Sequence, residues 1–188
     1  EVTVGATGGS TSSQYPKAMN NLLGTKFKIV LGYPGGNDVN LALERGEIDG
    51  RCAWSLSSMK STRPSWLTDG TLNLLVQINF ARSPELPNTP SISEFSDARQ
   101  AAIMRFLYAP EQIARPFAAP PGIPPARLKI LRDAFMATMK DPEFLADARQ
   151  LNYTITPRSG DELARMIEQD MRTPLEIIEK TAKLTSAP

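Results

Sequence analysis

Over the first third of the chain, short β-type runs of hydrophobic residues alternate with helical stretches. Residues 1–6 (EVTVGA) and 27–31 (FKIVL) are rich in β-branched and aromatic side chains, which favours strands. Each run is followed by a polar turn with two adjacent glycines and then by apolar residues at helical spacing, over about 14–23 and 39–43. The pattern predicts two consecutive strand, turn and helix units.

The second of these units has a tight turn at residues 33–36 (YPGG). We expect Asn37 and Asp38 to cap the helix that follows, and Gly46 to end it. The first N–H groups of a helix have no partner within the helix, and the helix dipole places partial positive charge there. The turn is therefore a candidate anion site, although glycines that only permit the turn, with Asn37 as a simple cap, are an alternative interpretation.

The first unit has the same organisation, with residues 7–13 (TGGSTSS) as its turn. Free backbone N–H groups beside the hydroxyls of Ser10 and Thr11 would suit a carboxylate, and an N-cap with additional serines is the alternative. The turn does not match the phosphate-loop, dinucleotide-binding or nucleophile-elbow motifs. In a parallel sheet both turns would lie at the carboxyl ends of their strands, where two helix N-termini could face each other and hold one small anion.

A third strand is predicted at 47–53, and the two residues after it should lie on the same edge of the sheet. Trp54 there could form a wall of a ligand pocket or simply cover the end of the sheet. Ser55 could donate a hydrogen bond to a ligand. We expect Asp49, within the strand, to make structural hydrogen bonds rather than to perform catalysis.

The remaining elements change in character near residue 120, after which helices dominate. In order, the sequence predicts a polar connection at 60–69, a strand near 73–78, a proline-rich extended loop at 82–90, a short turn or helix at 91–94, a helix at 98–108, a β-type piece at 113–118, helices at 126–139 and 143–151, a short strand at 153–156 and a helix at 159–183 interrupted at 173–174. The predicted organisation is an α/β lobe at 1–120 followed by a helical segment at 121–188.

Composition excludes several classes of function. The 188 residues carry a net charge of +1 without a basic cluster, which disfavours nucleic acid as a partner. The absence of histidine excludes a Ser-His-Asp triad and a histidine zinc site, and we expect neither a metal nor a cofactor. The single cysteine excludes an internal disulfide, and no apolar run is long enough to cross a bilayer. Because the chain opens at Glu1 in a strand-like run, we expect a mature or trimmed piece.

Several short motifs, taken in order, resemble one protein family. They are the opening strand with Gly8-Gly9-Ser10-Thr11, then Tyr33-Pro34-Gly35-Gly36, Gly46-Glu47-Ile48-Asp49, Arg82 with Leu86-Pro87-Asn88-Thr89-Pro90 and Glu94, and Ala119-Pro120-Pro121-Gly122-Ile123-Pro124. The chain resembles the solute receptors of the tripartite tricarboxylate transporter family, which are periplasmic binding proteins with two lobes. The resemblance covers only the second lobe and the C-terminal segment of the family pattern. The first lobe would precede Glu1, and the stretch at 96–112 is longer than is usual in the family.

The resemblance implies a periplasmic-binding-protein-like fold of type II and a small carboxylate ligand held by backbone amides, hydroxyls and water. By position, the implied contacts are Gly9, Ser10 and Thr11 in the first turn and Tyr33, Gly35, Gly36 and Asn37 in the second, to which the strand-end argument adds Trp54 and Ser55. Helix dipoles rather than arginine would neutralise the ligand. The implied partners are the membrane subunits of the transporter, and the implied location is the periplasm.

Two other functions remain open at this stage. A ligand-sensing regulatory domain would have the same fold. A hydrolase with Ser10 as nucleophile and Lys17 as base is the less favoured alternative, because Ser10 and Lys17 would lie far apart if residues 14–23 form a helix.

The predicted two-lobe organisation has two consequences. A chain that supplies one wall of the cleft should bind its ligand weakly or not at all. The segment after Pro121 should expose apolar stripes that belong against the first lobe, and we expect these to support a homo-oligomer. The stripes contain Leu128, Leu131, Phe135, Phe144, Leu145, Leu163, Met166 and Ile167.

Overall fold

The computed structural model describes residues 1–113 and 115–186 and divides into two compact units. Unit 1 contains Glu1–Trp54, Leu74–Tyr108 and Thr173–Pro188, and unit 2 contains Ser55–Asn73 and Ala109–Arg172. These units do not follow the predicted boundary at residue 120. Each contains segments that are far apart in the sequence.

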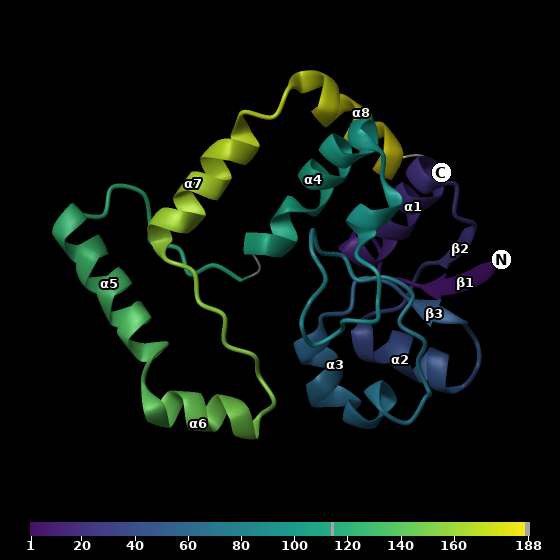
Figure 1. Ribbon diagram of the computed structural model, residues 1–188, viewed down its shortest axis with the longest axis horizontal. Coiled ribbons are helices and arrows are strands. Elements are labelled where there is room, and N and C mark those ends of the chain that lie inside the picture. Colours follow the sequence, from purple (N-terminus) through teal and green to yellow (C-terminus); the bar gives the residue numbers. More distant parts are fainter. Residues whose placement is uncertain (114, 187–188) are drawn as a thin grey trace. The chain divides into compact units, whose positions relative to one another are not determined.

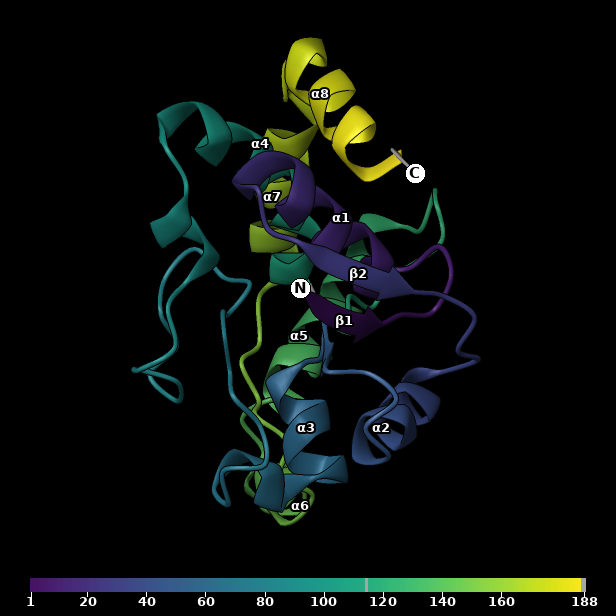
Figure 2. The same cartoon turned by 90° about the vertical axis from the view of Figure 1, so that its right-hand side faces the viewer.

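A three-stranded parallel sheet lies in unit 1 (Figures 1 and 2). Its strands are β1 (Val2–Gly5), β2 (Phe27–Val30) and β3 (Gly50–Arg51), in the order β2-β1-β3, and Val4 pairs with Ile29 on one side and Gly50 on the other. The third strand is shorter than the predicted 47–53. Ala53 has a φ of 55°, which ends the extended conformation on one side. On the other side, the Asp49 carboxylate accepts a hydrogen bond from the Thr3 amide (2.8 Å), which confirms its structural role.

The two predicted crossover helices form on opposite faces of this sheet, as Figures 1 and 2 show. Helix α1 (Thr11–Leu23) buries Tyr15, Ala18 and Met19, which helical spacing places on one face, and it ends at Gly24 with a φ of 69°. Helix α2 (Gly36–Glu44) begins three residues before the predicted stretch at 39–43.

The helix-capping prediction for Asn37 and Asp38 is wrong, because both residues lie inside α2 and Gly35 is its N-cap. Gly35 has extended backbone and offers no side-chain cap. The helix passes into Arg45 and then into Gly46, whose φ of 70° confirms that this glycine ends the helix.

The main core of unit 1 joins α1 to segments that are distant in the sequence. Tyr15 and Tyr108 meet edge to face with ring centroids 4.7 Å apart, and Met19, Ile92 and Met104 complete the buried cluster. Tyr108 and Met104 come from α4 (Ala98–Ile113), which begins in unit 1 and ends in unit 2. A smaller cluster of Val39, Ala42 and Ile48 lies between α2 and the sheet.

The C-terminal helix α8 (Leu175–Ser186) packs on α1 within unit 1, as Figure 1 shows. The Asn21 side chain donates a hydrogen bond to the Leu184 carbonyl oxygen (2.9 Å). Helix α8 therefore departs from the expectation that the whole segment after Pro121 lacks a packing partner within residues 1–120.

The predicted strand near 73–78 is wrong, since this stretch has only one parallel bridge, between Gln77 and Ser91. The buried Gln77 amide instead organises the proline-rich loop. Its nitrogen donates to the carbonyl oxygens of Leu86 (3.0 Å) and Thr89 (2.7 Å), so side-chain hydrogen bonds replace a ladder. The short helix predicted at 91–94 forms as η2 (Ile92–Phe95), with a complete capping box between Ser91 and Glu94.

Unit 2 is built from short helices. They are α3 (Leu56–Thr62), the 3₁₀ helix η1 (Pro64–Leu67), α5 (Pro125–Thr138), α6 (Pro142–Gln150) and α7 (Gly160–Met171). The interruption at 173–174 is confirmed, because α7 ends before it and α8 begins after it. Helices α5 and α7 contain no buried residue, and α6 buries only Ala148.

Three predictions that bear on unit 2 fail. The stretch at 60–69, predicted as a polar connection, contains the end of α3 and all of η1, in which Trp66 is buried. Among the described residues of 113–118 and 153–156 no strand forms; Ile113 ends α4, and Ala114 lies outside the described part.

None of the helices in the described ranges is long and apolar enough to span a membrane.

Candidate functional site

The two predicted ligand turns begin side by side at one edge of the sheet. Strands β1 and β2 are neighbours and run parallel, so the turns that follow them both lie at the carboxyl edge. The Ala6 amide donates to the Val30 carbonyl oxygen (2.9 Å) and extends the pairing into the start of both turns. In open α/β sheets, ligands bind outside the carboxyl ends of the strands.

The first turn contains a cluster of three hydroxyls from Thr7, Ser10 and Ser12. The Ser10 hydroxyl lies 2.6 Å from that of Thr7 and 2.7 Å from that of Ser12. Ser12 also accepts a hydrogen bond from the Thr7 amide (3.1 Å). The Ser10 side chain thus holds the turn together and makes no capping bond to α1.

The backbone of this first turn keeps its donors available. Within the described ranges, the amides of Gly9, Ser10, Thr11 and Ser12 donate no hydrogen bond to another part of the protein. Gly9 and Thr11 are exposed, and Gly9 has a φ of 67°, a left-handed conformation that favours glycine. The arrangement provides unpaired amides at the start of a 13-residue helix.

The predicted ligand residues of the second turn differ in their surroundings: one packs on a hydrophobic cluster, and the others are half-buried or exposed. Tyr33 packs against the Val39, Ala42 and Ile48 cluster, so its ring supports α2. Gly35 and Gly36 are half-buried, and Asn37 is exposed.

One acidic side chain approaches the amides at this helix start. A Cβ added at Gly35 would lie 3.3 Å from the Asp38 carboxylate, which places that carboxylate beside the N-terminus of α2. An incoming anion would compete with it for the positive end of the helix.

Sequence reasoning missed Arg51, the last residue of β3. Its Nη1 donates to the Gly36 carbonyl oxygen (2.9 Å) and to Oδ1 of Asn40 (2.6 Å). Its guanidinium carbon lies 4.7 Å from the centre of the Trp54 ring. The sequence led us to expect helix dipoles rather than arginine at the ligand, and the structure adds one guanidinium beside the second turn. Arg51 lies 15 residues beyond Gly36, so only strand pairing reveals the proximity.

The two site residues predicted after the third strand, Trp54 and Ser55, belong to different units. Trp54 is half-buried and belongs to unit 1, where its ring packs on Arg51. Ser55 belongs to unit 2, is exposed, and accepts a hydrogen bond from the Ser58 amide (3.3 Å) as the N-cap of α3. The structure gives Ser55 a structural role.

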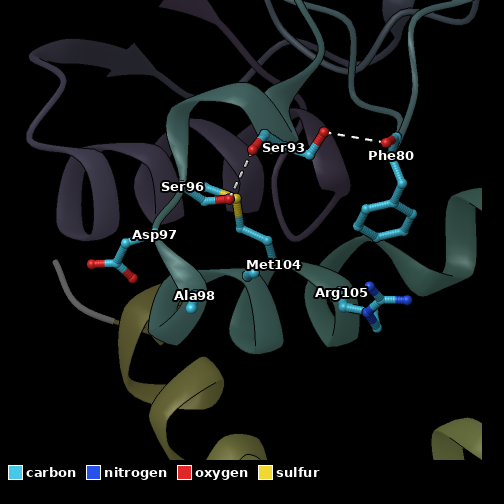
Figure 3. Close-up of a pocket in the computed structure, with 8 residues that line it drawn as sticks. Phe80, Ser93, Ser96, Asp97, Ala98, Met104 and Arg105 are labelled. Carbon is cyan, nitrogen blue, oxygen red and sulfur yellow. Dashed lines mark hydrogen bonds between the residues drawn. The ribbon is translucent and has the colours of Figure 1, made fainter.

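A separate pocket lies in unit 1 between η2 and the first turns of α4 (Figure 3). It has a volume of about 200 Å³ and is lined by Phe80, Ser93, Ser96, Asp97, Ala98, Ala101, Met104 and Arg105. Its hydroxyls are occupied, since Ser93 donates to the Phe80 carbonyl oxygen (3.2 Å) and Ser96 to the Ser93 carbonyl oxygen (3.0 Å). None of the predicted ligand residues lines it.

The described residues contain no group of three or more histidine, cysteine, aspartate or glutamate side chains that could hold a metal ion. In the same ranges, the side-chain partners of the Ser10 hydroxyl are the hydroxyls of Thr7 and Ser12. The side chains that contact the Ser10 hydroxyl in the described ranges therefore do not include a general base. The chemistry that the carboxyl edge offers is hydrogen bonding by amides, hydroxyls and one guanidinium.

Comparison with solved structures gives the fold. The chain is similar to a TctC solute-binding protein from Polaromonas, whose crystal structure holds no ligand, with a TM-score of 0.64 and 18% sequence identity. The similarity covers 96% of this chain and 57% of that protein, so the chain spans little more than half of its length. No protein-family model and no curated protein matches the sequence. The predicted α/β fold of the periplasmic-binding-protein type is confirmed.

Proposed function

We propose that the chain is one lobe of an extracytoplasmic solute-binding protein that recognises a small carboxylate for uptake by a tripartite tricarboxylate-type transporter. The observation that carries this proposal is the pair of glycine turns beside each other at the carboxyl edge, each leading into a helix. The unbonded amides of the first turn supply donors for an anion. The fold shared with a TctC solute-binding protein agrees with this role.

Binding without chemistry agrees better with these contacts than hydrolysis does. A serine nucleophile needs a base within hydrogen-bond reach, and the Ser10 hydroxyl contacts hydroxyls instead. Lys17 lies on α1, six residues after its first residue, where it cannot serve the turn directly. We therefore assign no catalytic residue, metal or cofactor to the site.

The proposal includes partners and a location. The membrane subunits of the transporter would receive the loaded receptor, and the protein would act in the periplasm. Helices α5 and α7 expose Ile130, Leu131 and Ile167, in keeping with a 121–188 segment that packs on another lobe or on a second copy of the chain. The helix α8 part of that segment is the exception, since it packs on α1.

Titration with succinate, followed through the backbone amide NMR signals, tests the site. We expect the signals of residues 8–12 and 35–38 to move together, with a dissociation constant in the millimolar range, which corresponds to about −4 kcal/mol. Succinamide, of nearly the same shape but without charge, is the matched control and should leave these signals in place. Movement confined to other residues, or equal movement with succinamide, would overturn the proposal.

A further inference from the structure

The residues around Arg51 hold its guanidinium in one position through hydrogen bonds and ring packing. Asn40 is only 1% exposed, and its Oδ1 is directed to Nη1 of Arg51 at 2.6 Å. A Cβ at Gly36 would lie 2.5 Å from Nη2, so the guanidinium lies close against the backbone of Gly36. The Trp54 ring packs on the group as well. Three residues, Gly36, Asn40 and Trp54, thus hold one arginine side chain.

The hydrogen bonding of this guanidinium is incomplete. A guanidinium has five N–H donors, and the hydrogen bonds of Arg51 to Gly36 and Asn40 both use Nη1. In the described part of the chain, no group accepts a hydrogen bond from Nε or Nη2 of Arg51. The Nε and Nη2 edge is the one that binds a carboxylate through two parallel hydrogen bonds.

The charge of Arg51 also lacks an acidic partner. The ion pairs among the described residues do not include it, and its two acceptors are a carbonyl and an amide oxygen. Burial lowers the pKa of the Arg51 guanidinium, but arginine remains protonated at neutral pH. A half-buried cation without a counter-charge is costly, and an anionic ligand would remove that cost.

We infer that Arg51 is the charged anchor of the ligand site and binds one carboxylate through Nε and Nη2 beside the second turn. This inference rests on the proposed function and narrows it. The unbonded amides of the first turn form a second set of donors, so the favoured ligand class is a dicarboxylate rather than a monocarboxylate. Arg51 thereby determines specificity, and the helix N-termini assist it.

The test compares succinate and propionate binding to the wild-type chain, Arg51→Gln and Arg51→Lys by NMR. In the wild type we expect the Arg51 Hε signal to move with succinate and to move less with propionate. Arg51→Gln should weaken succinate binding at least tenfold, and Arg51→Lys should recover part of that loss. The matched control is Arg45→Gln, which removes an arginine whose side chain is 68% exposed and should leave affinity unchanged.

The outcomes separate the two proposals. If wild-type turn signals move with succinate but Arg51→Gln binds equally well, or the Arg51 Hε signal stays in place, the inference is overturned and the proposed function stands. If neither turn responds to succinate in the wild type, both are overturned. Should Arg51→Gln fail to fold, as judged by its amide spectrum, the wild-type Hε signal and the Arg51→Lys affinity decide the question.

Discussion

Unit 1 and unit 2 hold their helices by different means. In unit 1, α1 lies between the sheet and α8, and its buried side chains pack with those of α4. In unit 2, α5 and α7 bury no residue. Among the described residues, they make the Arg132 to Asp161 ion pair (2.7 Å) and the Phe117 to Phe135 contact (5.4 Å between ring centroids). Exposed ion pairs contribute little, whereas buried apolar area contributes most of the stability.

This difference between the units shows that stability and helical structure have different sources: buried packing gives stability in unit 1, and local caps specify helices in unit 2. Helices α6 and α7 are specified locally, through side-chain caps at Asp141 and Ser159. The elements around the proposed site depend on contacts across the sequence. We therefore expect substitutions in unit 1 to change global stability and substitutions in unit 2 to change local helicity.

The largest expected effect is that of Tyr15→Ala in the unit 1 core. Tyr15 is 2% exposed and packs on Tyr108, so the change should lower the free energy of unfolding by about 3–5 kcal/mol. Ile130→Ala, at a position that is 67% exposed in α5, is the comparison and should change it by less than about 0.5 kcal/mol. Urea denaturation measures both. Similar decreases in the free energy of unfolding for the two variants would show that α5 contributes as much to stability as the core of unit 1.

A smaller effect is expected from Gly5→Ala, where β1 meets the second cluster. The new Cβ would lie 2.6 Å from Cδ1 of Ile48 and 3.1 Å from both the Tyr33 ring and Val39. Overpacking of this kind should cost about 1–3 kcal/mol. Gly8→Ala is the matched control, because a Cβ there meets no atom within 4 Å. Equal thermal shifts for the two variants would contradict the close packing at β1.

The same contrast explains what the sequence could predict. The helices at 126–139 and 143–151 were expected to within one residue at each end, because their signals are local: Asp141-Pro142 before one and apolar spacing along the other. Helix α3 was missed because Ser55 was interpreted as a ligand donor rather than as an N-cap. The 153–156 stretch has strand-forming residues, but no neighbouring strand pairs with it among the described residues.

The candidate site shows the same limit. Both glycine turns and their place after β1 and β2 were predicted, since strand, turn and helix follow one another along the chain. Arg51 was missed because its contacts with Gly36 and Asn40 arise only when β3 joins the sheet beside β1. Tyr33 was expected in the site, whereas the structure packs it on the cluster under α2.

A local effect is expected from Ser159→Ala at the start of α7. Ser159 accepts a hydrogen bond from the Glu162 amide (3.2 Å), and the Glu162 carboxylate accepts one from the Ser159 amide (2.7 Å). Loss of the cap should cost about 1 kcal/mol of helix stability. Faster amide exchange at 160–165, with the sheet unaffected, is the expected result. Ser159→Thr should retain slow exchange, and fast exchange there would show that the hydroxyl is not what holds the cap.

The smallest expected effect concerns the ion pair that closes the proline-rich loop of unit 1. The Arg82 guanidinium donates two hydrogen bonds to the Glu94 carboxylate (2.8 and 2.6 Å), and with the Ser91 amide it lowers the pKa of Glu94 to about 2. An unfolded glutamate titrates at about 4.3. Because the folded pKa is the lower one, the pair stabilises the protein above pH of about 4.3, and this stabilisation is lost as the pH falls towards 2.

The substitution Glu94→Gln measures that contribution. The variant should be less stable than the wild type at pH 7, and the difference should shrink progressively below pH of about 4.3. The effect stays small because both side chains are exposed, at 47% and 40%, where solvent screens the pair. Glu168→Gln, on an exposed position of α7, is the control and should track the wild type throughout. A Glu94→Gln deficit that stays constant from pH 7 to pH 2.5 would assign the effect to lost capping of η2 and not to charge.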